Sequence, residues 1–295
     1  MLAIVIPYYK FHFFEELLES IANQTDKRFR VYIGDDQSKV DPTILLDKFR
    51  GSFSFEYKRF ANNLGGISLV KQWNRCLEMV EDEEWVLILG DDDTLSENVV
   101  EQFYNNLEEI QSTASVVRFA TYKIDETSQR ISQKYTHPKL ELATDFLFRD
   151  TRSSLSEFIF KKNEIQSIGF KDFPLAWFSD LLAVLEFSHF KSIYSVNEAF
   201  MNIRISSFSI SGSDDNQKLK AKATFEFYYF LLTEKKEHFA KNQIEILLRR
   251  MSKCYVYNKK EVHFFLIISK LHFNNFALKS YWNFVNAILK NYNKK

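Results

Sequence analysis

The first 110 residues alternate between short apolar runs and segments with helical spacing. The apolar runs are typical of strands and lie at residues 2–6, 30–34, 53–60 and 85–89. The helical patterns between them lie at residues 13–24, 42–49 and 67–80. Such alternation predicts an α/β fold in which a mostly parallel central sheet carries helices on both faces.

The remaining chain has two different patterns. Strand-like runs at 115–122, 156–161, 193–196 and 199–203 mix with helical patterns at 97–111, 163–168 and 181–187. From Leu219 onward the pattern is helical, at 219–232, 241–257, 260–272 and 275–291. We predict one α/β domain over 1–213, with halves 1–113 and 114–213, and a helical extension over 214–295.

Charge is distributed unevenly along the chain. Residues 214–295 hold 16 Lys/Arg and 7 Asp/Glu, a net charge of +9, which leaves 23 basic and 32 acidic residues, or −9, for 1–213. This asymmetry indicates either an anionic partner for the C-terminal part or attraction between the two parts.

Several sequence features bear on localisation. The two cysteines give no disulfide framework and fit a reducing compartment. The first residues lack the features of a signal peptide, and the longest apolar stretches fall far short of the roughly 20 residues that a membrane-spanning helix needs. We therefore predict a cytoplasmic protein.

Three consecutive aspartates, Asp91, Asp92 and Asp93, follow the apolar run at 85–89. Adjacent carboxylates repel one another, and burial adds a desolvation cost. A divalent cation would remove much of that cost, and hard oxygen ligands suit Mg²⁺ or Mn²⁺ together with a phosphate-bearing substrate. The alternative is an acidic turn that caps a helix beginning near Ser96.

Two other predicted strands also end in unusual groups. Pro7 and Tyr9 follow the first strand, and Asp36 follows the second. The carboxyl ends of parallel strands meet at one edge of a sheet, where ligands of α/β proteins bind. The sequence therefore predicts that these residues and the three aspartates share one active site.

In order and spacing these pieces resemble the family 2 glycosyltransferases of the GT-A fold, over residues 1 to about 213. The matching segments are Ile4-Val5-Ile6-Pro7-Tyr8-Tyr9, Tyr32-Ile33-Gly34-Asp35-Asp36-Gln37-Ser38, Asn63-Leu64-Gly65, Trp73-Asn74, Asp91-Asp92-Asp93-Thr94-Leu95, Asp180 and Arg204-Ile205-Ser206. The resemblance implies an inverting hexosyltransferase that uses a nucleotide-sugar donor, with a UDP-sugar favoured. It also implies a saccharide or lipid-linked saccharide acceptor in bacterial surface polysaccharide synthesis, such as O-antigen or capsule.

The resemblance implies roles for five residues in binding the nucleotide sugar. Pro7 and Tyr9 lie where the family holds the base, and Asp36 would accept the imide N–H of uracil. Lys71 and Arg204 would contact the phosphates. For Tyr9 the alternative is a core tyrosine, and for Lys71 it is a solvated lysine.

The metal motif of this chain departs from the usual Asp-x-Asp-Asp pattern. Alignment to Asp93 places Gly90 at the first aspartate position. Asp92 then falls on the metal-ligand position, Asp91 lies near the ribose, and Asp93 assists the metal through water or caps the next helix. The resemblance thus implies Mg²⁺ or Mn²⁺ held by Asp92 and Asp93.

Asp180 lies where the family places its catalytic base. An inverting transfer needs a carboxylate that takes the proton of the acceptor hydroxyl. Phe173, Trp177 and Phe178 precede it and are expected to stack on sugar rings. The alternative role for Asp180 is to cap the helix that begins at Leu181.

The resemblance also gives a setting for the basic C-terminal helices. They would dock peripherally on the inner face of the cytoplasmic membrane, where lipid-linked acceptors lie, and would bind no nucleic acid. The alternative is that their aromatic cluster at 225–230 packs on the catalytic domain. Two rival functions remain: a nucleotidyltransferase-like enzyme and a non-catalytic protein that binds nucleotide sugars.

Overall fold

The computed structural model describes residues 1–149, 153–206, 216–257 and 262–292, and the chain divides into two compact units. Unit 1 comprises Met1–Asp172 and Ser179–Ser213, and unit 2 comprises Phe173–Phe178 and Asp214–Lys295. The serine-rich segment at 206–216, with the predicted boundary at 213/214, lies almost wholly outside the described residues.

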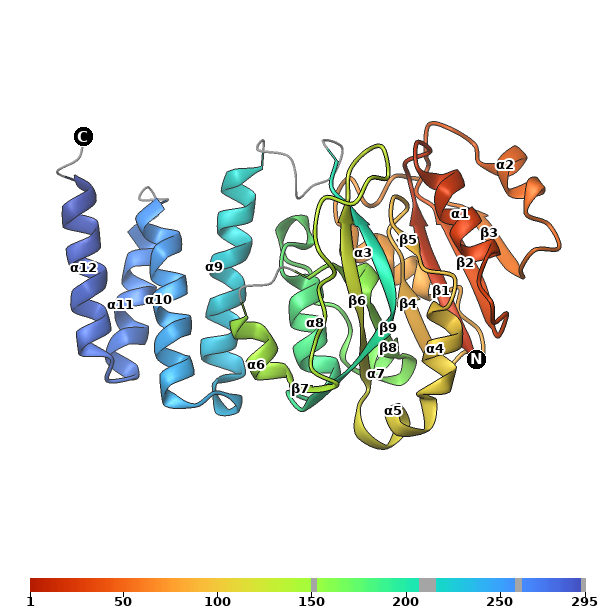
Figure 1. Cartoon of the computed structure of the whole chain (residues 1–295). Helices are drawn as coiled ribbons and strands as arrows, with labels where there is room; N and C mark the ends of the chain where they lie inside the picture. Colours follow the sequence, from red (N-terminus) through yellow and green to blue (C-terminus); the bar gives the residue numbers. More distant parts are fainter. Residues whose placement is uncertain (150–152, 207–215, 258–261, 293–295) are drawn as a thin grey trace. The chain divides into compact units, whose positions relative to one another are not determined.

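Unit 1 is built on one sheet, which has nine strands in the described residues (Figure 1). The order is β3-β2-β1-β4-β8-β6-β9-β5, with β7 paired to β9. The strands are β1 Leu2–Tyr8, β2 Phe29–Asp35, β3 Phe55–Arg59, β4 Trp85–Ile88, β5 Thr94–Leu95, β6 Val116–Ile124, β7 Leu140–Leu142, β8 Phe158–Lys161 and β9 Ser192–Arg204.

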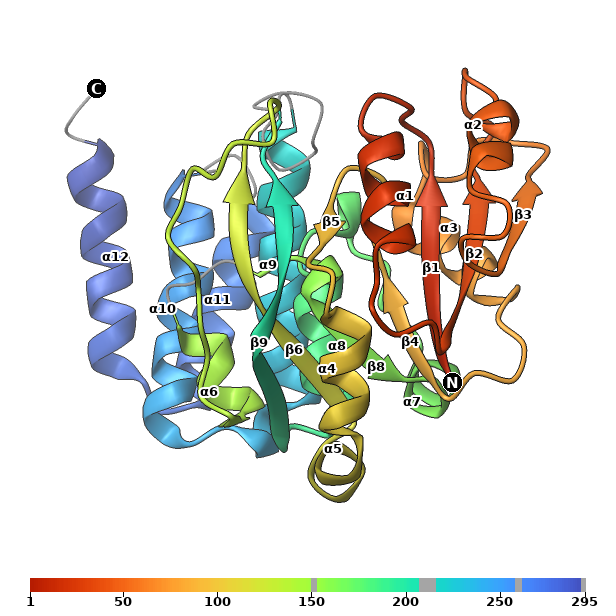
Figure 2. The ribbon, with the colours of Figure 1, turned by 45° about the vertical axis from the view of Figure 1, so that its right-hand side comes forward.

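The N-terminal half of the sheet is parallel, as the alternating pattern predicts. β1 pairs in parallel with β2 and β4, and β2 pairs in parallel with β3. In Figure 2 the arrows of these four strands point the same way. β8 then enters antiparallel between β4 and β6, while β6 and β9 are parallel. The whole sheet is therefore mixed, and its parallel half carries the carboxyl-terminal edge that the sequence singles out.

Helices cover both faces of this sheet. Figure 2 shows α1 and α4 on one face and α3 and α8 on the other. The helices of unit 1 are α1 Phe14–Ala22, α2 Thr43–Lys48, α3 Leu69–Leu77, α4 Val99–Asn105, α5 Leu107–Thr113, α6 Ala143–Phe148, α7 Lys162–Ile168 and α8 Ser179–Phe187, with the 3-10 turn η1 Leu155–Glu157. Unit 1 is thus the helix-flanked α/β sheet that the sequence predicts.

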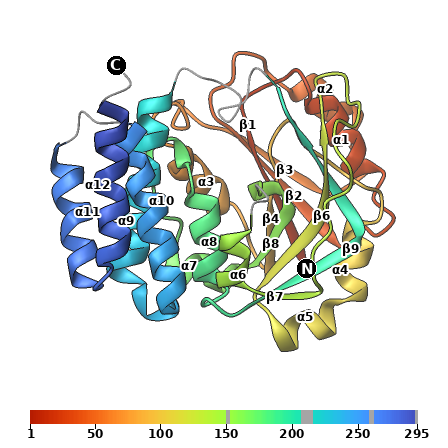
Figure 3. The ribbon, with the colours of Figure 1, turned by 60° about the vertical axis from the view of Figure 1, so that its left-hand side comes forward.

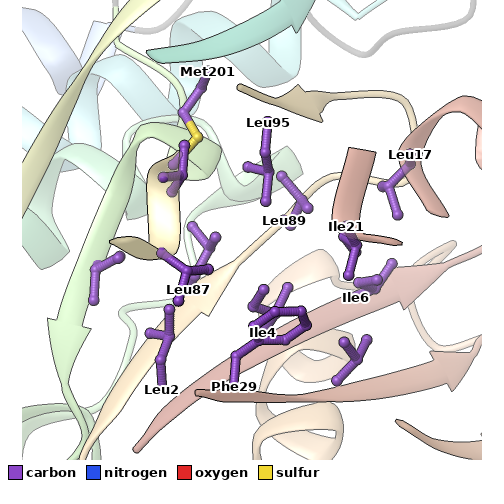
Figure 4. Close-up of a cluster of buried hydrophobic side chains, with 14 of the residues drawn as sticks. Leu2, Ile4, Ile6, Leu17, Ile21, Phe29, Leu87, Leu89, Leu95 and Met201 are labelled. Carbon is purple, nitrogen blue, oxygen red and sulfur yellow. The ribbon is translucent and has the colours of Figure 1, made fainter. Parts of the chain in front are cut away.

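The core of unit 1 surrounds β1. Leu2, Ile4 and Ile6 are fully buried and pack with Leu87 and Leu89 of the neighbouring β4 segment (Figure 4). The residues between them on the other face of β1 are also fully buried. A continuous apolar run suits a parallel strand that has helices on both sides, since neither face meets water.

Two predicted elements differ in the structure. The helix expected over 97–111 is two helices, α4 and α5, separated at Asn106. The Asn106 side chain donates to the Gln102 carbonyl and accepts from the Tyr194 hydroxyl, so it competes with the helix backbone at that point. The two strands expected over 193–203 form the single strand β9, and a register shift lies opposite Phe119 and Ala120.

Pro7 does not end the first strand as predicted. β1 continues to Tyr8, with Pro7 opposite Gly34 of β2. The ladder between β1 and β4, in contrast, ends at Val5, whose carbonyl accepts from the Leu89 amide. Proline lacks an N–H, so it is tolerated where the pairing partner on that side has ended.

Unit 2 is helical, as predicted. It contains α9 Gln217–Glu234, α10 Lys241–Tyr257, α11 Val262–Asn274 and α12 Leu278–Tyr292, with the 3-10 turns η2 Pro174–Ala176 and η3 Lys236–His238. Figure 3 shows the four helices side by side, and α10 contacts each of the other three. None of the described helices is long and apolar enough to cross a bilayer.

The aromatic cluster at 225–230 packs largely inside unit 2. The Phe225 ring stacks 3.7 Å from the Phe264 ring of α11, and the Phe227 ring stacks 4.7 Å from the Phe178 ring. Phe225 and Phe227 are therefore core residues of this unit.

Candidate active site

The structure brings the three unusual strand ends to one edge of the sheet. The Asp36 amide donates to the carbonyl of Tyr8, which joins the end of β2 to the end of β1. The Asp91 side chain accepts from the backbone amides of Tyr9 and Lys10 at 2.8 and 2.6 Å, which joins the segment after β4 to the segment after β1. The predicted convergence is therefore observed.

The three aspartates form a compact acidic turn, which we call the aspartate turn (Asp91–Asp93). Asp91 and Asp93 are 7% and 5% exposed, and the Asp92 side chain is 16% exposed. Burial, and then the charge of Asp92, raises the pKa of both Asp91 and Asp93. Burial in the turn thus disfavours the ionised forms of Asp91 and Asp93.

Lys10 supplies a positive charge beside the aspartate turn. Its Nζ lies 3.5 Å from the Asp92 Oδ2, while its backbone amide holds Asp91. Its ammonium charge and the two amide bonds partly offset the pKa rise of Asp91. Lys10 therefore occupies a place where a cation is favoured.

β5 positions Asp93. This two-residue strand pairs with the end of β9 and brings Asp93 beside Arg204, whose backbone amide donates to Asp93 Oδ1 at 2.9 Å. Ser156 hydrogen-bonds the Asp93 side chain and accepts from the Gly90 amide at 3.0 Å. The aspartate turn is consequently fixed from two distant segments of the chain.

Arg204 is buried, and its guanidinium is engaged inside unit 1. It donates to the Asp92 carbonyl at 2.9 Å, to the Asp125 carbonyl at 2.8 Å and to Glu16 at 2.8 Å. It also lies 4.0 Å from the centre of the Phe13 ring. In this arrangement Arg204 positions the aspartate turn. The predicted contact of Arg204 with a donor phosphate stays a prediction, and it would require the guanidinium to leave these partners.

Asp36 organises the loop before α3. Its two oxygens accept from the amides of Leu64 and Gly65 at 2.7 and 2.8 Å, and it forms a buried ion pair with Arg75. Arg75 also donates to the side chain and carbonyl of Asn62. The predicted contact of Asp36 with a uracil base stays a prediction, since its observed partners are all in the protein.

Gly65 is required by this packing, and its substitution gives a testable prediction. A Cβ on Gly65 would lie 2.6 Å from the Asp36 Oδ2, and Asp36 is held too firmly to move away. We expect Gly65→Ala to lower the free energy of unfolding by about 1–3 kcal/mol in denaturant titrations. Ile67→Ala is the control, because Ile67 is 80% exposed, and equal stability of the two variants would contradict the assignment.

Gly90 explains the departure from the family pattern. A Cβ there would lie 3.1 Å from Asp93 Oδ2, 3.3 Å from Asp92 Oδ1 and 3.4 Å from Ser156 Oγ. An aspartate at position 90 would push a third carboxylate between the other two. The same distances show that Asp92 and Asp93 turn oxygens toward a common point.

These two carboxylates suit a divalent cation. Mg²⁺ is usually bound through one or two carboxylates, with water and substrate phosphates as its other ligands. Asp92 and Asp93 supply such oxygens, and a bound cation would favour the ionised form of Asp93, whose pKa is raised by burial. Among the described residues no three His, Cys, Asp or Glu side chains are grouped as a metal site, so a cation would take its remaining ligands from the donor and water.

The burial of Asp93 predicts a pH effect on stability. Folding raises the pKa of Asp93 from its ordinary value of 3.8 to about 8. The folded state therefore binds the proton more tightly, and this group lowers the stability as the pH rises from about 4 to about 8. We expect Asp93→Asn to raise the melting temperature by about 2–4 °C at pH 8 and to change it little at pH 5. Equal shifts at both pH values would contradict this reading.

Asp180 lies at the start of α8. Helix α8 begins at Ser179, and the Asp180 Oδ1 accepts from the Leu181 amide at 2.8 Å. A carboxylate at a helix N-terminus is stabilised by the helix dipole. Asp180 is half-buried. It therefore combines the helix-start role with a side chain that can still reach solvent or a ligand.

A buried ion pair lies near Asp180. Glu157 is 2% exposed and pairs with Arg118 at 2.8 Å. Burial raises the pKa of Glu157 to about 7, and the charge of Asp180 contributes to the rise. Ser156, its neighbour in sequence, bonds Gly90 and Asp93, so the segment Ser156–Glu157 contacts the turn at one residue and carries the charge that Asp180 acts on at the next.

The sequence did not single out four residues that the structure places in the site. They are Lys10, Arg75, Ser156 and Glu157. Lys10 directly follows the strand-end tyrosines, so its position was a usable signal. Arg75, Ser156 and Glu157 gave no signal, because the partners that place them in the site, which are Asp36, Gly90 and Arg118, lie 39 to 66 residues away.

The other predicted residues have different surroundings. Tyr9 is 41% exposed, and Lys71 is exposed on α3, so neither is a core residue. Phe173 is buried against Phe227 within unit 2, so its ring is not open for stacking on a sugar as expected. Phe178 also stacks on Phe227, but Phe178 and Trp177 are half-buried, so their expected stacking on a sugar stays a prediction. The predicted base and phosphate contacts of Tyr9 and Lys71 stay predictions.

The fold and this edge of the sheet can now be compared with those of known proteins. The family described as Glycosyl transferase family 2 matches residues 3–180, which include the aspartate turn and Asp180, and the chain belongs to this family. No curated protein sequence matches the chain.

Solved structures of TarS from S. aureus share the fold. TarS 1–349 in complex with UDP-GlcNAc matches 97% of this chain and 81% of that chain, with 17% identity and a TM-score of 0.64. TarS 1–349 in complex with UDP matches 84% of this chain and 71% of that chain, with 17% identity and a TM-score of 0.61. The predicted GT-A architecture is thereby confirmed.

Proposed function

We propose that the chain is an inverting glycosyltransferase that moves a sugar from a UDP-sugar to a saccharide acceptor. The observation that carries the proposal is the buried aspartate turn held at the strand ends by the Tyr9, Lys10 and Arg204 amides, with Asp180 near the adjoining Ser156–Glu157 segment. Family membership supports the reaction type, and the bound UDP and UDP-GlcNAc of the TarS structures support a uridine donor.

In the proposed reaction the acceptor hydroxyl oxygen attacks the anomeric carbon from the face opposite the leaving group. Asp180 takes the hydroxyl proton, the bond between the anomeric carbon and the diphosphate oxygen breaks, and UDP leaves. A divalent cation held by Asp92 and Asp93 would neutralise the negative charge of the diphosphate. Lys10 would offer a second positive charge at the same edge.

The acceptor and the setting belong to the proposal as well. We propose a saccharide, including a lipid-linked one, in bacterial surface polysaccharide synthesis such as O-antigen or capsule. The net charge of +9 over residues 214–295 supports peripheral contact with the inner face of the cytoplasmic membrane.

A donor screen tests the function. The full chain would be incubated with Mn²⁺ and a panel of UDP-, GDP- and dTDP-sugars, and the released nucleoside diphosphate would be measured. We expect release from at least one UDP-sugar. Release from a GDP- or dTDP-sugar alone would overturn the uridine assignment. Absence of release from every donor, with UDP still bound, would instead indicate a protein that only binds nucleotide sugars.

A further inference from the structure

The last two helices of unit 2 each expose a stripe of large apolar side chains. The stripe of α11 consists of Val262, Leu266 and Phe273, and that of α12 consists of Leu278, Trp282 and Leu289, with exposures between 52% and 67%. Both stripes have the spacing i, i+4, i+11. At 100° per residue such positions fall within about 40° of the helix circumference. Each helix therefore has one narrow outward apolar face.

The opposite faces of the two helices are packed. On α11, Ile268 is fully buried, and on α12 Phe284 is buried against Tyr255 of α10 and Phe265 of α11. Both helices contact α10 and each other. The stripes lie about 140° from these buried residues, so both point away from α10.

The end of the α11 stripe lies beside α12, near the turn that joins the helices. The Phe273 ring lies 4.9 Å from the Tyr281 ring, and Phe276, in the turn itself, is 86% exposed. We call the seven residues together the α11–α12 face; they are Val262, Leu266, Phe273, Phe276, Leu278, Trp282 and Leu289. A monomeric protein rarely leaves so many large apolar side chains together in water without a partner.

The charges beside this face have one sign. Residues 262–292 contain three lysines, Lys270, Lys279 and Lys290, and no Asp or Glu. All three lysines are exposed. Apolar and aromatic side chains flanked by lysines are typical of helices that lie in the interface of a bilayer.

We propose that the α11–α12 face docks on an anionic lipid surface. Trp282, Phe273 and Phe276 would enter the headgroup region, and the three lysines would meet lipid phosphates. A second copy of the chain fits less well, because it would bring six lysines together without an acidic residue from these helices to pair with them. The inference gives the proposed peripheral contact a specific surface, and it holds whether or not the chain transfers a sugar.

Vesicle flotation with the full chain tests the proposal. The probes are phosphatidylcholine vesicles with and without about 30% phosphatidylglycerol, at about 0.1 M NaCl. One variant combines Phe276→Ser and Trp282→Ser, and a second combines Lys270→Gln, Lys279→Gln and Lys290→Gln. Ile44→Ser is the matched control, since Ile44 is an 82% exposed isoleucine of unit 1.

We expect wild type and the Ile44→Ser variant to float with the anionic vesicles and to bind the neutral ones far less. The lysine variant should lose about fivefold per lysine, on the order of a hundredfold in all. The aromatic variant should lose about tenfold or more. Unchanged melting temperatures and UDP affinities would show that both variants are folded.

Three outcomes would overturn the proposal. They are no flotation of wild type, equal binding to neutral and anionic vesicles, and unchanged binding of the aromatic variant. If light scattering shows a dimer of wild type that the aromatic variant loses, the occupant is a second copy instead. None of these outcomes depends on donor hydrolysis, so this proposal and the proposed function fail separately.

Discussion

Asp180→Asn is expected to lower the rate of sugar transfer by about 10³-fold while UDP affinity stays the same. The amide cannot take the proton of the acceptor hydroxyl, so the chemical step slows. It keeps an oxygen that can accept from the Leu181 amide, so the start of α8 remains intact. Transfer would be followed as UDP released in the presence of an acceptor, and UDP binding by calorimetry.

The control for this variant is Asp172→Asn. Asp172 is an exposed aspartate eight residues upstream that accepts from the Ser68 hydroxyl. The Asp172→Asn variant should keep the rate of sugar transfer within about twofold of wild type, because surface substitutions usually have small effects. Unchanged turnover of Asp180→Asn would remove Asp180 as the base. Parallel loss of transfer and of UDP binding would instead assign it a structural role at the start of α8.

The buried ion pair beside Asp180 does not replace it as a candidate base. Glu157 has a raised pKa, which is a frequent property of catalytic acids and bases. It is only 2% exposed and is paired with Arg118, so it cannot reach an acceptor hydroxyl without opening the core. Its position suits a residue that sets the electrostatic surroundings of Asp180.

The sequence predicted the parallel half of the sheet well because its signals are local. Residues 2–6 form a continuous apolar run, and a strand buried on both faces needs that pattern. The strand ends followed from the parallel arrangement, and therefore Tyr9, Asp36 and Asp91 could be placed at one edge before any coordinates.

The contacts that fix the site were not predictable, because they join distant segments. β5 is two residues long, and only its pairing with β9 makes it a strand. That pairing brings Arg204 to Asp93 over 111 residues of sequence. Arg204 illustrates the limit: an arginine before a serine-rich segment suggests a phosphate contact, whereas burial and four protein partners become visible only in the fold.

The aromatic residues near Asp180 show the same limit. The sequence alone does not distinguish an aromatic side chain that binds a sugar from one that packs in the core, since both are apolar and near a polar residue. The α9 helix supplies Phe227, which stacks on Phe178 and packs against Phe173. The exposed apolar stripes of α11 and α12 show it too: their spacing is regular in the sequence, but their exposure depends on how the helices pack on α10.

Asp92→Ala is expected to abolish the part of UDP affinity that depends on Mn²⁺. Asp92 turns Oδ1 toward the point that Asp93 also faces, so its removal leaves one carboxylate for the cation. A cation bridging protein and diphosphate contributes several kcal/mol, and we expect a loss of roughly 100-fold in calorimetry with UDP and Mn²⁺. Asp82→Asn is the control, because Asp82 is an exposed aspartate ten residues upstream.

The Lys10→Met variant tests whether Asp92 binds a divalent cation directly or whether its removal only changes the net charge of the site. Lys10 Nζ lies 3.5 Å from Asp92 Oδ2, and its ammonium competes with a divalent cation for the same carboxylate. Without it, Mn²⁺ should bind the donor-free protein more tightly, by about fivefold, while Asp92→Ala should bind it more weakly. The free ion can be followed by its paramagnetic resonance signal. Two results would contradict the assignment of the cation to the aspartate turn. One is equal UDP affinity of Asp92→Ala and wild type in Mn²⁺, and the other is weaker Mn²⁺ binding by Lys10→Met.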